Sequence, residues 1–316
     1  MTTNISQNTN PSKNIMQSIR NFFGSQKNRN KITHSLIYLV LGILSILWIF
    51  PIVWLVSHSF RGEYAGPVSY LFPKEWSFVA YNKILTPSST VQYAQWFTNT
   101  FIVAIFTCVI STLMVLLSSY AFSRLRFKGR LGIMKGILVI GMFPGFMAMI
   151  AVYFILKGIG LLPSGSNEVP VSNYLFALIL VYTSGAALGY YISKGFFDTI
   201  SKSLDEAAQI DGANRAQIFW HIILPLSRPI LIYTALTSFM GPWGDFIFVS
   251  VITKGNQEAW SIARGLYSLV VQLGYIDEWF TAFSAGAVII SIPIVFLFLL
   301  TQKYYVSGVT SGAVKG

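Results

Sequence analysis

Residues 206–225 read EAAQIDGANRAQIFWHIILP, a polar, glycine-containing segment that lies between two long apolar runs. A segment this polar cannot enter the hydrocarbon core of a bilayer, whereas apolar runs of about 20 residues are long enough to cross one. The segment is therefore held at the membrane surface. We expect a membrane protein to contact a soluble partner at such a place.

The composition indicates that lipid is the main solvent of this chain. Of its 316 residues, 54% are hydrophobic and only 10% are charged, whereas about 25% of residues are charged in an ordinary globular domain. The net charge is +11, but the basic residues fall in separate clusters between apolar runs. They form no single patch of the kind that a nucleic acid duplex needs, so no nucleic acid partner is expected.

The histidines and the single cysteine predict neither a metal site nor a disulfide. Cys108 lies alone within an apolar run, which excludes a disulfide framework and a thiolate metal cage. His34, His58 and His221 belong to different regions and have no second ligand at metal spacing. We therefore predict that the chain binds no metal.

Six apolar stretches meet or approach the roughly 20 residues that a membrane-spanning helix needs. The first runs into Trp48, Pro51 and Trp54 without a small-residue cleavage site, so we interpret it as a retained helix and not as a signal peptide. The predicted spans are about residues 34–58, 98–122, 132–157, 173–195, 229–252 and 281–302.

The distribution of lysine and arginine predicts the orientation of these spans, because basic loops stay on the cytoplasmic side. Residues 1–33 and residues 124–135 carry several basic residues and no acidic ones, so both are predicted to be cytoplasmic. Alternation then places the mixed-charge loops 59–97, 158–172 and 253–280 outside, and it places residues 201–228 and the tail 303–316 inside.

The N-terminal tail has an apolar periodicity of its own. Apolar residues between Ile15 and Phe23 recur at helical spacing among basic residues, which suits a short helix on an anionic membrane surface. The alternative is a disordered basic tail that only enforces orientation, because the residues before Asn10 show no periodicity.

Two short helices are predicted within residues 201–228. Ser203 and Glu206 have the spacing of a capping box, which predicts a helix that begins at Leu204. Gly212 can take the left-handed conformation that ends it. Two turns of helix are not stable alone in water, so this helix needs a surface to dock on. The groups expected to be exposed are small or acidic: Glu206, Ala207, Ala208 and Asp211.

The second short helix has its own start and stop signals. Asn214 and Gln217 offer a cap for its first turn. Pro225 is expected to end this helix, or to kink it where the chain re-enters the membrane. The segment is thus predicted to be a helix-turn-helix unit at the membrane surface.

Seven residues of this unit resemble a known motif. Glu206-Ala207-Ala208, Gly212, Ile222 and Leu224-Pro225 stand at the offsets of the EAA loop, which is found in membrane subunits of binding-protein-dependent ABC importers. Residues 119–124 and 242–246, and the ending at 306–316, further resemble carbohydrate-uptake permeases of the MalG type, which serve maltose and maltodextrin.

The resemblance implies an all-α membrane protein with the type I ABC importer permease fold. It implies six transmembrane helices with both termini cytoplasmic, of which the last five, within residues 98–302, form the shared core. The implied partners are a second homologous permease subunit, two ATPase subunits inside, a solute-binding protein outside, and membrane lipid. The implied location is the cell membrane of a bacterium or an archaeon.

The chain shows no nucleotide-binding loop, because no stretch reads G, four residues, then G-K and Ser or Thr. It is therefore expected to be a transport subunit and not an enzyme, and to bind no cofactor itself. ATP and Mg²⁺ are expected on the partner ATPase subunits.

The resemblance also implies roles for individual residues. In the family, the first short helix sits in a cleft of the ATPase, where Leu204 and the two alanines would fill the cleft and Glu206 would pair with a basic group. Gly212 would set the angle of the following chain. The implied coupling residues are Leu204, Glu206, Ala207, Ala208, Asp211 and Gly212.

Two further groups have open alternatives. Asp245 lies in an apolar run beside Trp243, and a carboxylate there is a functional candidate by default. It either lines an outer gate or the sugar path, or it hydrogen-bonds to Trp243 or backbone near the outer interface. Thr310, Gly312 and Lys315 belong either to a flexible end or, as the resemblance implies, to a tail that contacts the ATPase pair.

Two other classes of protein fit this sequence less well. An ion-coupled secondary transporter usually shows paired halves and several intramembrane ionisable groups, whereas Asp245 stands nearly alone here. An intramembrane enzyme needs a nucleophile and a base at matching membrane depth, and no such pair is visible among the Ser, His and Asp residues.

Overall fold

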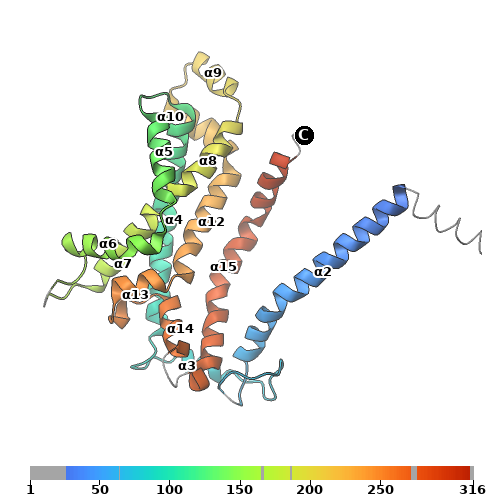
Figure 1. Cartoon of the computed structure of the whole chain (residues 1–316), viewed down its shortest axis with the longest axis vertical. Helices are drawn as coiled ribbons and strands as arrows, with labels where there is room; N and C mark the ends of the chain where they lie inside the picture. The colour runs from blue at the N-terminus through green and yellow to red at the C-terminus, as the bar shows by residue number, and fades with distance from the viewer. Residues whose placement is uncertain (1–25, 64, 165–166, 186, 272–275, 314–316) are drawn as a thin grey trace, which may run out of the picture. The chain divides into compact units, whose positions relative to one another are not determined.

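The computed structural model describes residues 26–313 except for 64, 165–166, 186 and 272–275. Within this described part, the regular elements are helices, and strand-like pairing is limited to two isolated bridges (Figure 1). The chain divides into two compact units, residues 1–57 and residues 58–316, and each is described by itself. The predicted all-α class is confirmed for the described residues.

Three helices are each long and apolar enough to cross a membrane without a break. They are α2 (Gln26–Ser59), α4 (Tyr93–Arg124) and α15 (Ile276–Ala313). They contain the first, the second and the last of the predicted spans. Pro51 lies within α2 and Pro293 within α15, and both helices continue through these prolines.

The third predicted span is split in two. Helices α5 (Arg130–Gly141) and α6 (Gly145–Gly158) meet at an angle of 99°. The span predicted for residues 132–157 is therefore not one straight helix but two helices that meet at a sharp bend. Pro144 has an extended backbone with ψ of 119° and immediately precedes α6, so it starts a new helix and does not merely kink one.

The next two predicted spans are also interrupted. Helices α7 (Val171–Ser184) and α8 (Ala187–Thr199) are bent by 45° between residues 184 and 189. Helix α12 (Arg228–Gly244) ends at Asp245, which has an extended backbone, and α13 (Ile247–Thr253) follows. By length and composition, the described part holds three candidate spans, or up to six if each bent helix pair is one span.

Shorter helices connect these elements. They are α3 (Val79–Leu85), α9 (Ser203–Ile210), α10 (Arg215–Ile218), the π-helix η1 (Phe219–Ile223), α11 (Leu224–Leu226), the 3₁₀-helix η2 (Gln257–Ala259) and α14 (Ile262–Val271).

Helix α4 is the centre of the larger unit and lies against α7, α8, α12 and α14 (Figure 1). In its first turn, Trp96 is fully buried and donates its indole N–H to the Gln257 carbonyl at 3.1 Å. The Asn99 amide donates to the Trp260 carbonyl at 3.0 Å. A Cβ built on Gly265 of α14 would lie 2.0 Å from the Trp96 ring, so only glycine permits this packing.

A second core cluster lies towards the other end of α4. Leu116 of α4 and Phe197 of α8 pack there with buried residues that follow in the chain, namely Ala208, Ile218, Ile223 and Ile230. This cluster attaches residues 201–228 to the long helices.

Candidate functional site

Residues 201–228 contain both predicted short helices, but the first is capped differently. Helix α9 begins at Ser203, one residue earlier than expected, and Lys202 occupies the position before it. The predicted capping box of Ser203 and Glu206 is wrong, because Ser203 lies inside the first turn. Its N–H donates to the Ser201 hydroxyl at 3.3 Å, so Ser201 takes over part of the cap.

Gly212 ends α9 as predicted. Its φ of +85° is in the left-handed region, which costs glycine little and most other residues more. The Ala213 N–H donates to the Ala208 carbonyl at 2.9 Å, and the Gly212 N–H donates to the Gln209 carbonyl at 3.1 Å. These two bonds satisfy carbonyls that the end of the helix would leave unpaired.

The cap of the second helix is confirmed, whereas its end is not where we predicted it. Asn214 and Gln217 form a reciprocal capping box with bonds of 2.9 and 2.8 Å. The helical path then continues through a π-turn and past Pro225, and the 80° bend falls at Ser227. Pro225 lies in α11, directly after the π-helix, and proline has no backbone N–H to donate there. Ser227 donates to the Ile223 carbonyl through both its N–H and its hydroxyl.

The side chains of α9 divide into a buried and an exposed set. Ala208 is only 9% exposed and packs into the second core cluster, so the expectation that it is exposed is wrong. Leu204, at 42%, is among the exposed large hydrophobic residues. The other predicted coupling residues are also exposed: Glu206, Ala207, Asp211 and Gly212.

Ile210 is a surface residue that the sequence reasoning missed. Its side chain is 86% exposed. Ala207 lies three residues before it and Glu206 four residues before it, so all three share one face of α9. The signal in the sequence was an apolar residue at this spacing on an otherwise polar face. Ile210 thus adds an exposed apolar side chain to this face of α9.

Arg124 fastens α9 to the end of α4, and this attachment was also missed. Its Nε lies 3.3 Å from Asp205 Oδ2, and the two side chains are 4% and 13% exposed. Its Nη2 also donates to the carbonyls of Phe197 at 3.2 Å and Ile200 at 2.8 Å. A single guanidinium thus joins the ends of α4 and α8 to the first turn of α9.

Asp245 lies at a helix break and not deep within a continuous helix. Its carboxylate accepts from the Tyr182 hydroxyl at 2.9 Å and from the Phe248 N–H at 3.0 Å, so it caps α13 and ties it to α7. The predicted bond to backbone is confirmed. The alternative bond to Trp243 is wrong, because that indole is 3% exposed and its N–H has no hydrogen-bond partner in the described structure.

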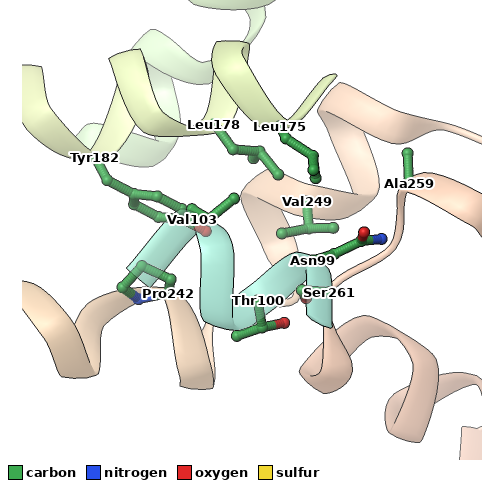
Figure 2. A pocket seen from close by; sticks show the side chains of 10 residues that line it. All are labelled: Asn99, Thr100, Val103, Leu175, Leu178, Tyr182, Pro242, Val249, Ala259 and Ser261. Carbon is green, nitrogen blue, oxygen red and sulfur yellow. The ribbon is translucent and has the colours of Figure 1, made fainter. Parts of the chain in front are cut away.

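The cavity beside this break is too small for a substrate. Figure 2 shows Tyr182, Leu178 and Leu175 of α7 facing Val103 of α4, with Pro242 of α12 at the edge. Its volume is about 10 Å³, which is room for one water molecule. The cavity therefore has no room for a sugar ring.

The remaining predicted sites are only partly described. Thr310 and Gly312 lie in the last turns of α15, and the Thr310 side chain is outside the described part of the structure. Lys315 and the tail segment between Ile15 and Phe23 are also outside them. The described residues include no group of three or more His, Cys, Asp or Glu side chains arranged to hold a metal ion.

The described structure thus combines long apolar helices with a short, largely exposed helix, α9, which a buried ion pair fastens to them. Residues 114–311 match the family described as "Binding-protein-dependent transport system inner membrane component", and the chain belongs to this family. It is a transport subunit and not itself an enzyme.

Two characterised relatives match nearly the whole chain. The galactooligosaccharides transport system permease protein GanQ of Bacillus subtilis (strain 168) is 36% identical over 88% of this chain and 94% of its own. The maltodextrin transport system permease protein MalD of Streptococcus pneumoniae (strain ATCC BAA-255 / R6) is 34% identical over 92% of this chain and 99% of its own. The predicted resemblance to carbohydrate ABC permeases is confirmed.

The fold also matches a solved structure. A bacterial ABC transporter involved in the import of the acidic polysaccharide alginate contains a chain with a TM-score of 0.71 and 24% identity. The match covers 89% of this chain and 98% of that chain. The ABC importer permease fold is thereby shown.

Proposed function

We propose that this permease subunit carries an oligosaccharide of the maltodextrin or galactooligosaccharide class through an ATP-driven importer. The observation that carries the proposal is the match to permeases of such sugars over at least 88% of the chain. The subunit would form half of the translocation path. A second, homologous permease subunit would form the other half.

The proposed topology has six spans. They are α2, α4, the pairs α5–α6 and α7–α8, the region of α12 and α13, and α15. The basic residues in segments 1–33 and 124–135 support cytoplasmic placement of both. Residues 201–228 and both termini would then face the cytoplasm of a bacterium or an archaeon.

We further propose that α9 couples the membrane helices to two ATPase subunits, which would hold ATP and Mg²⁺. Leu204, Ala207 and Ile210 supply apolar surface to a cleft in the ATPase. Glu206 and Asp211 are exposed and available to basic groups of the partner. Closure of the ATPase pair would then move α9, and Arg124 would transmit this motion to α4 and α8.

A solute-binding protein is the proposed supplier of the sugar on the outside. A solved alginate transporter of similar fold, with a TM-score of 0.62, is in complex with an alginate pentasaccharide-bound periplasmic protein. The loops that would meet such a protein here include residues 58–78 and η2.

Reconstitution of the importer tests the proposed function. The permease is placed in liposomes with its partner permease, the ATPase and the binding protein, and uptake of maltotriose and of a galactotriose is measured. We expect uptake that requires ATP and the binding protein. Uptake by the chain alone, driven by a proton or sodium gradient, would instead identify an ion-coupled secondary transporter, and a binding protein specific for amino acids would overturn the sugar assignment.

A further inference from the structure

A groove between α4, α7, α8 and α12 combines apolar side chains and glycines with several hydroxyl groups. Its volume is about 290 Å³, close to the lower end of the roughly 300–1,000 Å³ found for small-molecule sites. No charged side chain is among the described residues that line it. Its hydroxyl groups belong to Thr107, Ser111, Tyr182, Tyr233, Thr234, Thr237 and Ser238.

Two of these hydroxyls are buried without a hydrogen-bond partner. Thr107 is 2% exposed and Ser111 is 1% exposed, and neither side-chain oxygen has a partner in the described structure. A serine or threonine in a helix usually donates to the carbonyl four residues earlier. Thr98, Thr100 and Ser119 of the same helix α4 all do so.

The unpartnered hydroxyls point to a ligand because of where they lie. Thr107 and Ser111 are four residues apart, so they occupy one face of α4, and both line the groove. Leaving a buried hydroxyl unpaired costs free energy. A ligand that offers hydroxyl donors and acceptors in the groove would remove that cost.

The groove adjoins the small cavity of Figure 2 and has open space at its wall. Tyr182 and Pro242 line both the groove and the small cavity of Figure 2, so they separate the two. A Cβ built on Gly241 would meet no atom within 4 Å. The backbone here leaves room for a ring-shaped ligand beside α12.

We propose that this groove is the sugar-contact surface of the subunit, and that it takes a neutral sugar unit. This inference rests on the proposed function. A neutral sugar matches the lining because its hydroxyls both donate and accept hydrogen bonds, as those of Thr107 and Ser111 do. An acidic sugar would bury a carboxylate at membrane depth without a cation in the lining, which is costly.

Removal of the two hydroxyls tests the proposal in the complete importer. Thr107→Val and Ser111→Ala keep the size of the side chains nearly constant and delete the hydroxyls. We expect each to lower maltotriose uptake about fivefold and the double variant about 25-fold, since each removes one hydrogen bond to the sugar.

The matched control is Thr98→Val, which removes a hydroxyl of α4 that is exposed and already bonded to Ala94. This variant should transport like wild type. A double variant that takes up maltotriose within twofold of wild type would overturn the groove as the sugar site. An equal loss in the control would show a general defect of α4 and would also overturn it.

Cysteine protection provides a readout that does not depend on transport. Cys108 is the only cysteine of this chain, so Cys108→Ala gives a background without thiols in this subunit. Thr237→Cys is placed in the groove, and Thr199→Cys, exposed at the end of α8, is the control. Labelling by a methanethiosulfonate reagent is followed as a mass shift of this chain.

Maltotriose delivered by the binding protein should slow the labelling of Thr237→Cys at least fivefold and leave Thr199→Cys unchanged. An alginate pentasaccharide, which is acidic, should protect neither position. Equal labelling of Thr237→Cys with and without maltotriose would overturn the proposal. If the wild-type importer takes up no neutral sugar at all, the proposed function fails first and the groove assignment fails with it.

Discussion

Two polar segments at opposite ends of α4, residues 58–78 and residues 201–228, differ in how their polar groups are paired. Residues 58–78 pair their charged groups Arg61 and Glu63 within the segment. The Arg61 side chain is buried, and it donates to Glu63 at 3.0 Å, to the Tyr70 carbonyl at 3.0 Å and to His58 at 3.2 Å. Glu63 in turn accepts the N–H of Lys74 and further donors.

Residues 201–228, in contrast, are satisfied on one face only. Arg124 and Ala208 hold α9 to the long helices, whereas Glu206, Ala207 and Ile210 face away. A segment that completes its own bonds gains stability without a partner. The proposed coupling role requires one firm attachment and one exposed surface, and α9 has both.

The largest effect is expected from Gly212→Asp. This variant should leave the subunit in the membrane and abolish transport, because it adds a Cβ and a charge at a left-handed position, φ +85°. An added Cβ meets no atom within 4 Å, so the effect would come mainly from the charge and not from a clash. Uptake in reconstituted importers measures it.

Gly212→Asn is the matched control, because asparagine tolerates this conformation and carries no charge. It should keep a substantial part of the uptake. Normal uptake by Gly212→Asp would end the proposed coupling role of this turn.

The second largest effect should come from the attachment of α9. Arg124→Gln breaks a buried ion pair, and removing one partner of such a pair typically costs about 3–5 kcal/mol. We expect ATP hydrolysis to continue while sugar uptake per ATP falls about tenfold or more, because α9 moves without α4. Simultaneous assays of uptake and hydrolysis give this ratio.

Asp205→Asn should uncouple less than Arg124→Gln, because Arg124 would keep its bonds to the carbonyls of Phe197 and Ile200. The opposite order, or a full ratio in both variants, would show that the ion pair transmits no motion.

A smaller effect is expected from a change of Ile210 on the exposed face of α9. Ile210→Ser should change the stability of the isolated subunit by less than about 0.5 kcal/mol, as surface changes usually do. It should weaken association with the ATPase about tenfold, since burial of such a side chain is worth roughly 1.5–3 kcal/mol. Binding of the ATPase to the purified subunit is the measurement.

Ile218→Ser provides the contrast, because Ile218 is 1% exposed and belongs to the second core cluster. This variant should destabilise the subunit itself. If Ile210→Ser binds the ATPase like wild type, Ile210 is not part of the docking surface.

The smallest effect is expected from a change of pH on residues 58–78. Partial burial favours the neutral form of Glu63, but hydrogen bonds from the N–H groups of Lys74 and Glu75 and from the Tyr70 hydroxyl outweigh it and lower its pKa from 4.5 to about 2. A lowered pKa in the folded state stabilises the segment above pH 4.5, and this contribution is lost as the pH falls towards 2.

Hydrogen-exchange protection factors of residues 61–77 should therefore decrease between about pH 5 and about pH 2, which is roughly the interval between the ordinary and the lowered pKa of Glu63. Those of α9 should change little. Glu63→Gln should show the low protection already at pH 7. Equal protection in this variant and in wild type would mean that Glu63 does not organise the segment.

Much of the fold was predictable because membrane helices need long apolar runs, and such runs stand out in the sequence. Three of the predicted spans correspond to unbroken helices. A count of apolar residues carries no direction, however, so it could not show that the chain turns by 99° before α6 or that α12 ends at Asp245.

In the candidate site, roles that depend on neighbouring residues could be predicted from the sequence, whereas roles that depend on distant residues could not. Gly212, Asn214 and Gln217 act on neighbours within a few residues, so their roles were readable from spacing. Ala208 and Arg124 have roles set by residues far away in the chain. Nothing within the segment itself indicates which face of α9 the core covers.

The bonds at the start of α4 constrain how the protein is made. Trp96 donates to Gln257, Asn99 donates to Glu258 and Trp260, and these partners lie about 160 residues later in the chain, for example 161 for Trp96 and Gln257. During synthesis, α4 reaches the bilayer long before they exist. A buried amide without a hydrogen-bond partner is costly in lipid. An unfinished chain therefore keeps unpaired polar groups on α4 until residues 257–260 have been added.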